Sequence, residues 1–173
     1  RPAPPEYFTE KNMKLDDAIA GRRSMREFLP DPVPQGTVHR ILEIASRAPS
    51  GTNIQPWKVI VVTGDDQAKV TKAIMDYRLE EAKADAPKDT KMPRRWAEPY
   101  LSRRRKVGYD MYAKLGIEKG DKPAMWAQHG RNYEFFGAPV GLFFVVDEDL
   151  DQASWLDLGM FMQNVMLVAK QEG

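Results

Sequence analysis

A group of cationic and hydroxyl side chains lies near the start of the sequence, in the segment GRRSMREF, residues 21–28. Three guanidinium groups and one hydroxyl fall within five positions, at Arg22, Arg23, Ser24 and Arg26. Guanidinium groups bind phosphate through paired hydrogen bonds, and a serine adds a neutral donor. The segment is therefore a candidate anion site. The alternative is a solvated basic helix end, which the helix dipole favours.

A second polar segment, APSGTNIQPW at residues 48–57, separates a predicted helix from a predicted strand. Loops in such places often carry function. Its hydrogen-bonding side chains are Ser50, Thr52, Asn53 and Gln55. Gly51 would let a ligand or another backbone approach closely, since it has no side chain. The alternative is an ordinary turn, because serine, glycine and asparagine are common turn formers.

The elements that must position these two segments follow from the hydrophobic pattern. Apolar residues at helical spacing predict helices over residues 14–21 and 34–48. The runs KVIVVT (residues 58–63) and VGLFFVV (residues 140–146) predict strands, and the first is expected to be buried on both faces. Only two good strands are visible, which is few for a stable sheet beside so much apolar helix.

The rest of the chain is predicted to be mainly helical. In order we expect a turn at 64–66, a helix of about three turns from Gln67, a helix at 103–115, a loop at 116–123 and a strongly apolar helix at 155–170. Residues 82–99 are charged and interrupted by proline, so no element is assigned there. Strands flanked by helices indicate a layered α+β or α/β domain.

Composition limits the possible functions. The chain has 173 residues, 42% of them apolar, which is enough for one domain with its own core. A net charge of +1 gives no reason to expect nucleic acid or an anionic membrane as a partner. There is no cysteine, which excludes disulfides and thiolate chemistry and favours a cytoplasmic setting. The two histidines are isolated, so we expect no metal site.

Together, at this spacing and in this order, the two polar segments resemble the FMN-dependent nitroreductase family. The similar stretches are RRSMREF, ILEIASRA and PSGTNIQPW, at residues 22–28, 41–48 and 49–57, followed by the strand at 58–63. Later stretches, GAPVGLFFVVDEDL (137–150) and SWLDLGMFMQNVMLVA (154–169), resemble the family's central strand and long dimer helix.

The resemblance implies a fold. We expect an α+β, nitroreductase-like three-layer α-β-α sandwich, dimeric, whose central mixed sheet is flanked by helices. An extended arm at residues 1–13 would precede an FMN-binding domain at 14–173. The family normally continues with a strand that contacts flavin N5, a further basic residue and an extension that wraps the partner. We therefore expect the domain to be incomplete at its C-terminus.

The resemblance also implies an FMN site. Arg22, Arg23 and Ser24 match the cluster that holds the FMN phosphate and ribityl chain, and Arg26 matches the basic residue that faces flavin N1. The loop that reaches FMN from the partner subunit corresponds to Pro49, Ser50, Gly51, Thr52 and Asn53. We expect no catalytic side chain, because the flavin carries the chemistry.

The implied activity is the transfer of hydride from NADH or NADPH to FMN and then of electrons to a nitroaromatic, quinone or similar acceptor, in ping-pong order. Residues 100–136 look most like branches that act on nitroaromatics such as nitrobenzoates. The implied assembly is a homodimer with FMN at its interface. Two alternatives stay open: a reductive dehalogenase of the iodotyrosine type, and a relative that binds or cleaves flavin without nicotinamide turnover.

Overall fold

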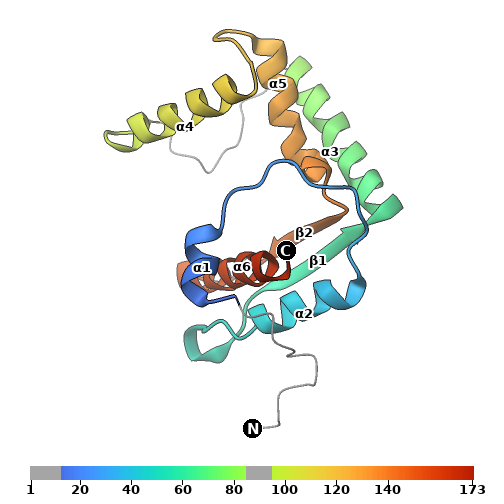
Figure 1. The fold of residues 1–173 in the computed structure, drawn as a ribbon, viewed down its shortest axis with the longest axis vertical. Helices are drawn as coiled ribbons and strands as arrows, with labels where there is room; N and C mark the ends of the chain where they lie inside the picture. Colours follow the sequence, from blue (N-terminus) through green and yellow to red (C-terminus); the bar gives the residue numbers. More distant parts are fainter. Residues whose placement is uncertain (1–12, 85–94) are drawn as a thin grey trace. The chain divides into compact units, whose positions relative to one another are not determined.

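A computed structural model of the chain describes residues 13–84 and 95–173. The elements are α1 (Leu15–Gly21), α2 (Gln35–Ala45), η1 (Gly51–Asn53), β1 (Lys58–Thr63), α3 (Gly64–Ala84), α4 (Tyr100–Lys114), α5 (Lys122–Gly130), η2 (Arg131–Gly137), β2 (Val140–Val145) and α6 (Gln152–Glu172), as Figure 1 shows. They form two compact units, of which the first holds residues up to 67 and from 138, and the second holds 68–137. No helix in the described ranges is long and apolar enough to cross a membrane.

The sheet of the first unit is an antiparallel pair. β1 and β2 align with Lys58 opposite Val145 and Thr63 opposite Val140. Both strands were predicted by their β-branched and aromatic residues, and the α+β class is confirmed. Within the described residues the sheet has these two strands, which are antiparallel to each other.

The expectation that β1 is buried on both faces is wrong for this chain. Ile60 is 56% exposed and Val61 is 42% exposed, whereas Val62 is buried. The apolar side chains of the sheet that join the main core, Val59 and Phe144 among them, pack together with residues of α2 and α6. Ile60 and Val61 are successive residues and therefore point to opposite faces of the sheet, so β1 is partly exposed on both faces.

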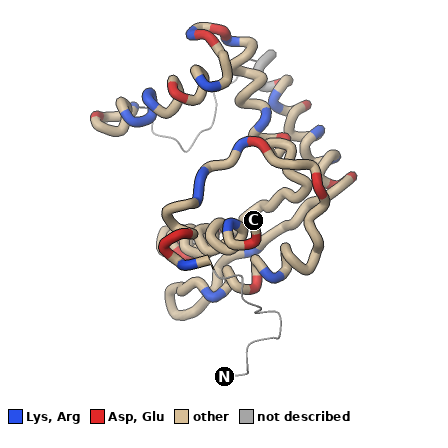
Figure 2. The backbone as a smooth tube through the Cα atoms, viewed as in Figure 1, with Lys and Arg blue, Asp and Glu red and all other residues tan. Residues whose placement is uncertain are grey.

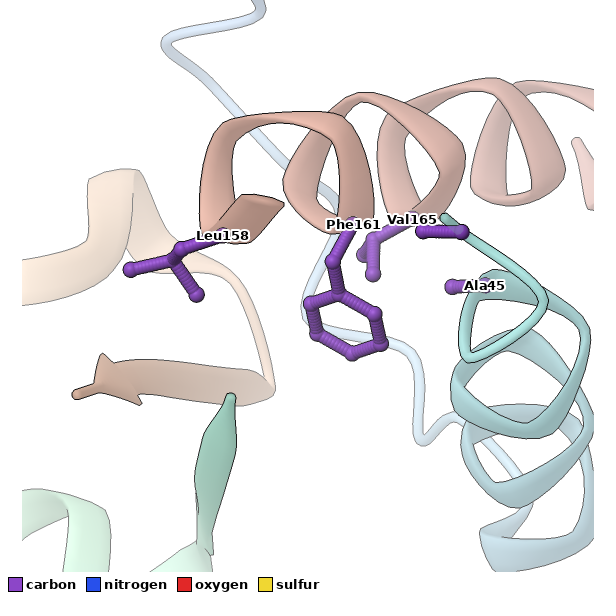
Figure 3. Packing of buried hydrophobic residues seen from close by; sticks show 5 residues of the cluster. Ala45, Leu158, Phe161 and Val165 are labelled. Atoms are coloured by element: carbon purple, nitrogen blue, oxygen red, sulfur yellow. The ribbon is translucent and has the colours of Figure 1, made fainter. Parts of the chain in front are cut away.

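The core of the first unit lies between α6 and the end of α2. Leu158, Phe161 and Val165 of α6 are buried together with Ala45 and Ala48. Figure 3 shows Phe161 and Val165 pointing from α6 toward the end of α2 that carries Ala45. Small residues at this end of α2 let the helices approach closely, so the phenyl ring of Phe161 fills the space between them.

The buried stripe of α6 differs from the one expected from the sequence. We predicted one face carrying Trp155, Leu158, Met162, Val165, Met166 and Ala169. The buried residues are Ser154, Asp157, Leu158, Phe161, Val165 and Val168. Both sets follow helical spacing, and the helix is rotated so that the large ring of Phe161 is fully buried while Trp155 is exposed.

Several predicted boundaries of elements shift. α2 ends at Ala45, three residues earlier than expected, and α4 begins at Tyr100. The turn expected at 64–66 is instead the start of α3, whose 21 residues are about twice the predicted length. Aspartates in its first turn, Asp65 and Asp66, stabilise this start through the helix dipole. Residues 1–12 and 85–94, on which the expected arm and part of the 82–99 segment fall, lie outside the described residues.

The second unit is organised around a buried arginine. Arg78 of α3 is 7% exposed. Its Nη2 donates a hydrogen bond of 2.6 Å to the carbonyl oxygen of Trp126. The guanidinium carbon lies 3.5 Å from the centroid of the Trp126 ring and 5.6 Å from that of Tyr133. This cation–π cluster joins α3 to α5 and η2, because Trp126 and Tyr133 belong to those elements.

Candidate functional site

The arginine segment, residues 22–26, begins where α1 ends. The Arg22 N–H donates to the carbonyl oxygen of Ala18 at 3.0 Å, and the backbone of Arg22 is already extended. The chain therefore leaves the helix at this residue. Arg22 is half-buried, whereas residues 23–26 are exposed. Figure 2 shows positive charge on the stretch of chain that leaves α1.

The Arg23 side chain caps the C-terminal end of α1. Its Nη1 donates to the carbonyl oxygens of Ala20 and Arg22, the latter at 2.9 Å. These carbonyls are among those that a helix C-terminus leaves without intrahelical partners. The alternative of a basic helix end therefore describes Arg23 in this structure. A guanidinium has five N–H donors, so the same side chain still has donors for an anion.

The loop at residues 49–53, here called the 49–53 loop, is tightly turned. The Asn53 N–H donates to the carbonyl oxygen of Ser50 at 3.0 Å, and the Ile54 N–H donates to that of Gly51 at 3.1 Å. The hydroxyl oxygen of Ser50 accepts a hydrogen bond of 2.9 Å from the Gln55 N–H. The carbonyl and hydroxyl oxygens of Ser50 therefore both accept hydrogen bonds that shape the loop.

The backbone of this loop has an uncommon conformation. Thr52, Asn53 and Gln55 have positive φ angles of 47°, 61° and 50°. Asparagine tolerates this left-handed region, but a β-branched residue such as threonine adopts it rarely. Such strain persists where the surrounding structure enforces it, and it is concentrated at functional sites. The turn-forming composition predicted a turn here but gave no signal for the strain at Thr52.

Two consecutive turns of α6 contact the 49–53 loop and Trp57, the residue before β1. The Gly51 N–H donates to Asp157 Oδ2 at 3.0 Å. The rings of Trp57 and Phe161 stack with centroids 5.0 Å apart and 6° between their planes. Asp157 and Phe161 are four residues apart, so they lie one above the other on the same helix face. Sequence reasoning missed Asp157, although a carboxylate on the apolar helix SWLDLGMF was the available signal.

The two segments adjoin α6 at different positions along the helix. A Cβ built on Gly21, next to the arginine segment, would lie 3.6 Å from Lys170 Cε. The 49–53 loop meets the same helix at Asp157. Asp157 and Lys170 are thirteen positions apart, which at 1.5 Å per residue is about 20 Å along the helix axis. The arginine segment leaves α1 near one end of α6, and the loop packs near the other.

Comparison with known proteins covers nearly the whole chain. The model of the nitroreductase family matches residues 19–173, a range that includes both polar segments. A 4-nitrobenzoate reductase of Pseudomonas putida is 37% identical over 159 residues, which are 92% of this chain and 69% of the reductase. The solved FMN and NADPH-dependent nitroreductase NfnB from Sphigopyxis sp. strain HMH is 40% identical, with a TM-score of 0.87 over 93% of this chain and 72% of that one.

A weaker similarity covers less of the chain. Iodotyrosine deiodinase of Nematostella vectensis is 30% identical over 76 residues, which are 41% of this chain. The likeness to the dehalogenase scaffold is therefore partial, whereas the likeness to the nitrobenzoate reductase covers 92% of the chain.

Proposed function

This chain belongs to the nitroreductase family, and we propose that it is a flavin-dependent reductase that uses FMN and NADH or NADPH to reduce nitroaromatic or quinone acceptors. The observation that carries the proposal is a match at 40% identity and a TM-score of 0.87 with a reductase described as FMN and NADPH-dependent. The matched family range includes the arginine segment and the 49–53 loop, the two places where the sequence itself points to a ligand.

The donor chemistry of the arginine segment fits the phosphate of FMN. The half-buried Arg22 supplies a planar pair of donors suited to phosphate oxygens, and the exposed hydroxyl of Ser24 supplies a third. Arg23 shares its guanidinium between the end of α1 and the ligand. We assign the phosphate and the ribityl chain to these three residues.

We assign the contacts with the isoalloxazine ring of FMN to Arg26 and the 49–53 loop. Bound FMN supplies the hydride chemistry, because the isoalloxazine ring takes two electrons from a nicotinamide and gives them to an acceptor. We assign Arg26 to flavin N1, where a guanidinium would stabilise the negative charge that reduction adds. The 49–53 loop, at Pro49, Ser50, Gly51, Thr52 and Asn53, supplies a preformed backbone for one edge of the ring. No protein nucleophile is needed for this chemistry.

The assembly we propose is a homodimer with FMN at the interface. The separation of about 20 Å between the two attachment points on α6 supports a site built from the arginine segment of one subunit and the 49–53 loop of the other. Exposed apolar side chains on α6 also support a partner surface, among them Trp155 at 56% and Leu156 at 71% exposure.

The acceptor we propose is a small aromatic nitro compound, with nitrobenzoates as the first class to test. The support is the 4-nitrobenzoate reductase of Pseudomonas putida, which is similar over 92% of this chain. We also place the protein in the cytoplasm, since a chain without cysteine has no disulfide to form in an oxidising compartment. Fractionation of cells would test that placement.

The central experiment is anaerobic spectroscopy of the full protein. Denaturation should release about one FMN per subunit. Adding NADPH or NADH should bleach the flavin absorbance, and 4-nitrobenzoate should restore it. A protein that holds no FMN after reconstitution would contradict the proposal. FMN that is bound but never bleached would favour a binding or flavin-cleaving relative, and loss of iodide from iodotyrosine in place of nitro reduction would favour the dehalogenase.

A further inference from the structure

We infer that Asp157 is a positioning residue of the FMN site, which holds the 49–53 loop in the shape that the cofactor needs. The inference depends on the proposed function and adds a residue that lies outside both polar segments. Asp157 acts through Gly51, with which it shares a hydrogen bond, and it belongs to a helix 106 positions further along the chain.

The burial of Asp157 calls for an explanation. The side chain is 7% exposed, on the face of α6 that also carries Leu158, Phe161 and Val165. Burying a carboxylate in an apolar core is costly unless hydrogen bonds stabilise it. The Gly51 N–H is a donor at 3.0 Å from Oδ2. An apolar residue here would add to the core but would leave the Gly51 N–H without its acceptor. The carboxylate at this position is therefore explained by its hydrogen bond to the loop and not by core packing.

The loop has a physical need for this anchor. Its positive φ angles at Thr52, Asn53 and Gln55 are enforced partly from within, by hydrogen bonds to Ser50 and Gly51. Internal bonds fix the shape of a turn but not its place on the protein. The bond to Asp157 ties the start of the loop to α6.

The end of the same segment is tied to α6 one turn further on, by the stack of Trp57 on Phe161. The two ties together fix both the position and the orientation of the 49–53 loop. The bond also commits the Gly51 N–H to the protein. Gly51 therefore contributes close backbone approach, with a donor that already has its acceptor, while Asp157 itself does not touch FMN.

The test compares two substitutions of Asp157 with a core control, all in the full protein. Asp157→Ala removes the acceptor, whereas Asp157→Asn keeps an oxygen that can accept from the Gly51 N–H. Val165→Ala opens a cavity on the same buried helix face, about two turns away from Asp157, in the core cluster that includes Ala45 and Phe161. The readouts are the Kd for FMN, from quenching of its fluorescence, the visible circular dichroism of bound FMN, and the melting temperature of the protein without FMN.

We expect Asp157→Ala to weaken FMN binding by about tenfold or more, the scale of a lost hydrogen bond to a charged group, and to alter the dichroism of the flavin. Asp157→Asn should stay within about threefold of the parent, since the bond is retained. Val165→Ala should lower the melting temperature with FMN affinity within the same threefold range. A parental Kd and dichroism in Asp157→Ala would overturn the inference, as would a loss of affinity that only follows melting temperature across all variants.

The donor side gives a second test that does not require Asp157→Ala to fold. Gly51→Pro deletes the N–H, and Gly51→Ala keeps it. The backbone accepts proline here, because Gly51 starts η1 and Ser50 before it is extended at φ −146° and ψ 155°. A Cβ on Gly51 would lie 3.9 Å from Asp157 Oδ2, an ordinary contact. Both variants add a Cβ and differ in the N–H, so we expect Gly51→Pro to bind FMN about tenfold more weakly than Gly51→Ala. Equal affinity in both variants would reject the inference, whereas a parent protein that binds no FMN would reject the proposed function instead.

Discussion

Trp57 and Phe161 lie face to face, with ring centroids 5.0 Å apart and planes inclined by 6°. One ring comes from the residue that leads into β1 and the other from the buried face of α6. Phe144 of β2 meets the same phenyl ring edge-on, at 5.9 Å and 70°. Phe161 thus joins β2 and the residue that leads into β1 to α6.

We expect Phe161→Ala to lower the free energy of unfolding by about 3–5 kcal/mol, because it removes a fully buried ring and leaves a cavity. Phe161→Leu should cost about 1–2 kcal/mol, since it keeps most of the volume. The measurement is urea unfolding followed by tryptophan fluorescence. Lys119→Ala, on the exposed loop between α4 and α5, is the control and should stay within about 0.5 kcal/mol. A small effect of Phe161→Ala would mean that the core is centred elsewhere.

The two arginines assigned to opposite ends of FMN should respond differently to loss of charge. Arg26→Gln should lower the midpoint potential of bound FMN by some tens of millivolts, because a charge near N1 favours the reduced form by about 1–3 kcal/mol. Arg22→Gln should weaken FMN binding with little change in potential, since a phosphate contact exists in both redox states. Redox titration beside FMN affinity measures both effects.

The reverse pattern, a shifted potential in Arg22→Gln and uniform weakening in Arg26→Gln, would exchange the two roles. If neither variant affected the flavin, the assignment of residues 22–26 to FMN would be wrong. Lys106→Gln on α4 changes the same net charge by one unit outside both segments, and it should leave potential and affinity unchanged.

A site shared between subunits predicts complementation. Thr52→Pro should destroy the 49–53 loop, because proline cannot adopt the φ of 47° found there. Homodimers of Arg22→Ala or Thr52→Pro should each bind FMN poorly. A heterodimer of the two variants should keep one intact site of its two, and so bind about half an FMN per subunit. Titration of purified heterodimers would measure this stoichiometry.

A heterodimer without any tight site would show that the arginine segment and the loop of the same chain act together. Thr52→Gly is the matched control for the loop, since glycine adopts positive φ readily and keeps the backbone shape. Its heterodimer with an Arg22→Ala subunit should keep one site, and its homodimer should keep both.

The buried arginine of the second unit predicts an energetic coupling. A Cβ on Gly130 would lie 2.8 Å from Arg78 Nη1, closer than real contacts allow. Gly130→Ala should therefore cost about 1–3 kcal/mol in the parent protein. In an Arg78→Met background the guanidinium is absent, and the same change should cost much less. Denaturant unfolding of the four proteins in this cycle gives the coupling energy.

Gly108→Ala is the matched control, because a Cβ there meets nothing within 4 Å and the residue lies inside α4. That change should stabilise the protein by up to about 1 kcal/mol through helix propensity. Additive costs of Gly130→Ala and Arg78→Met would argue that the two residues do not share the packing described for them.

Periodicity predicted most of the elements because their patterns are local. The β-branched run of β1 and the apolar spacing of α6 are both found where expected. The face of α6 was harder, because Phe161, Leu158 and Met162 give several similar apolar stripes and tertiary packing selects among them. The length of α3 was underestimated, since a Gly-Asp-Asp sequence is as common in turns as at helix starts.

The candidate site was predictable where it depends on side-chain chemistry. Arg22, Ser24 and the loop residues were named from their types and spacing, and their assignment to FMN remains a proposal. The contact between Gly51 and Asp157 could not be predicted, because 106 positions separate the two residues and nothing local links them. The left-handed backbone at Thr52 was equally hidden, since threonine gives no preference for it.

The spacing along α6 has an evolutionary consequence. The helix contacts the 49–53 loop at Asp157 and the end of α1 at Lys170, so the positions of the loop and of the arginine segment both depend on α6. One residue inserted between Asp157 and Lys170 would rotate one end of the helix relative to the other by about 100° and lengthen the helix by about 1.5 Å. Relatives that bind the same cofactor should therefore differ freely in the exposed residues of this stretch, and insertions or deletions should be confined to the connections on either side of it.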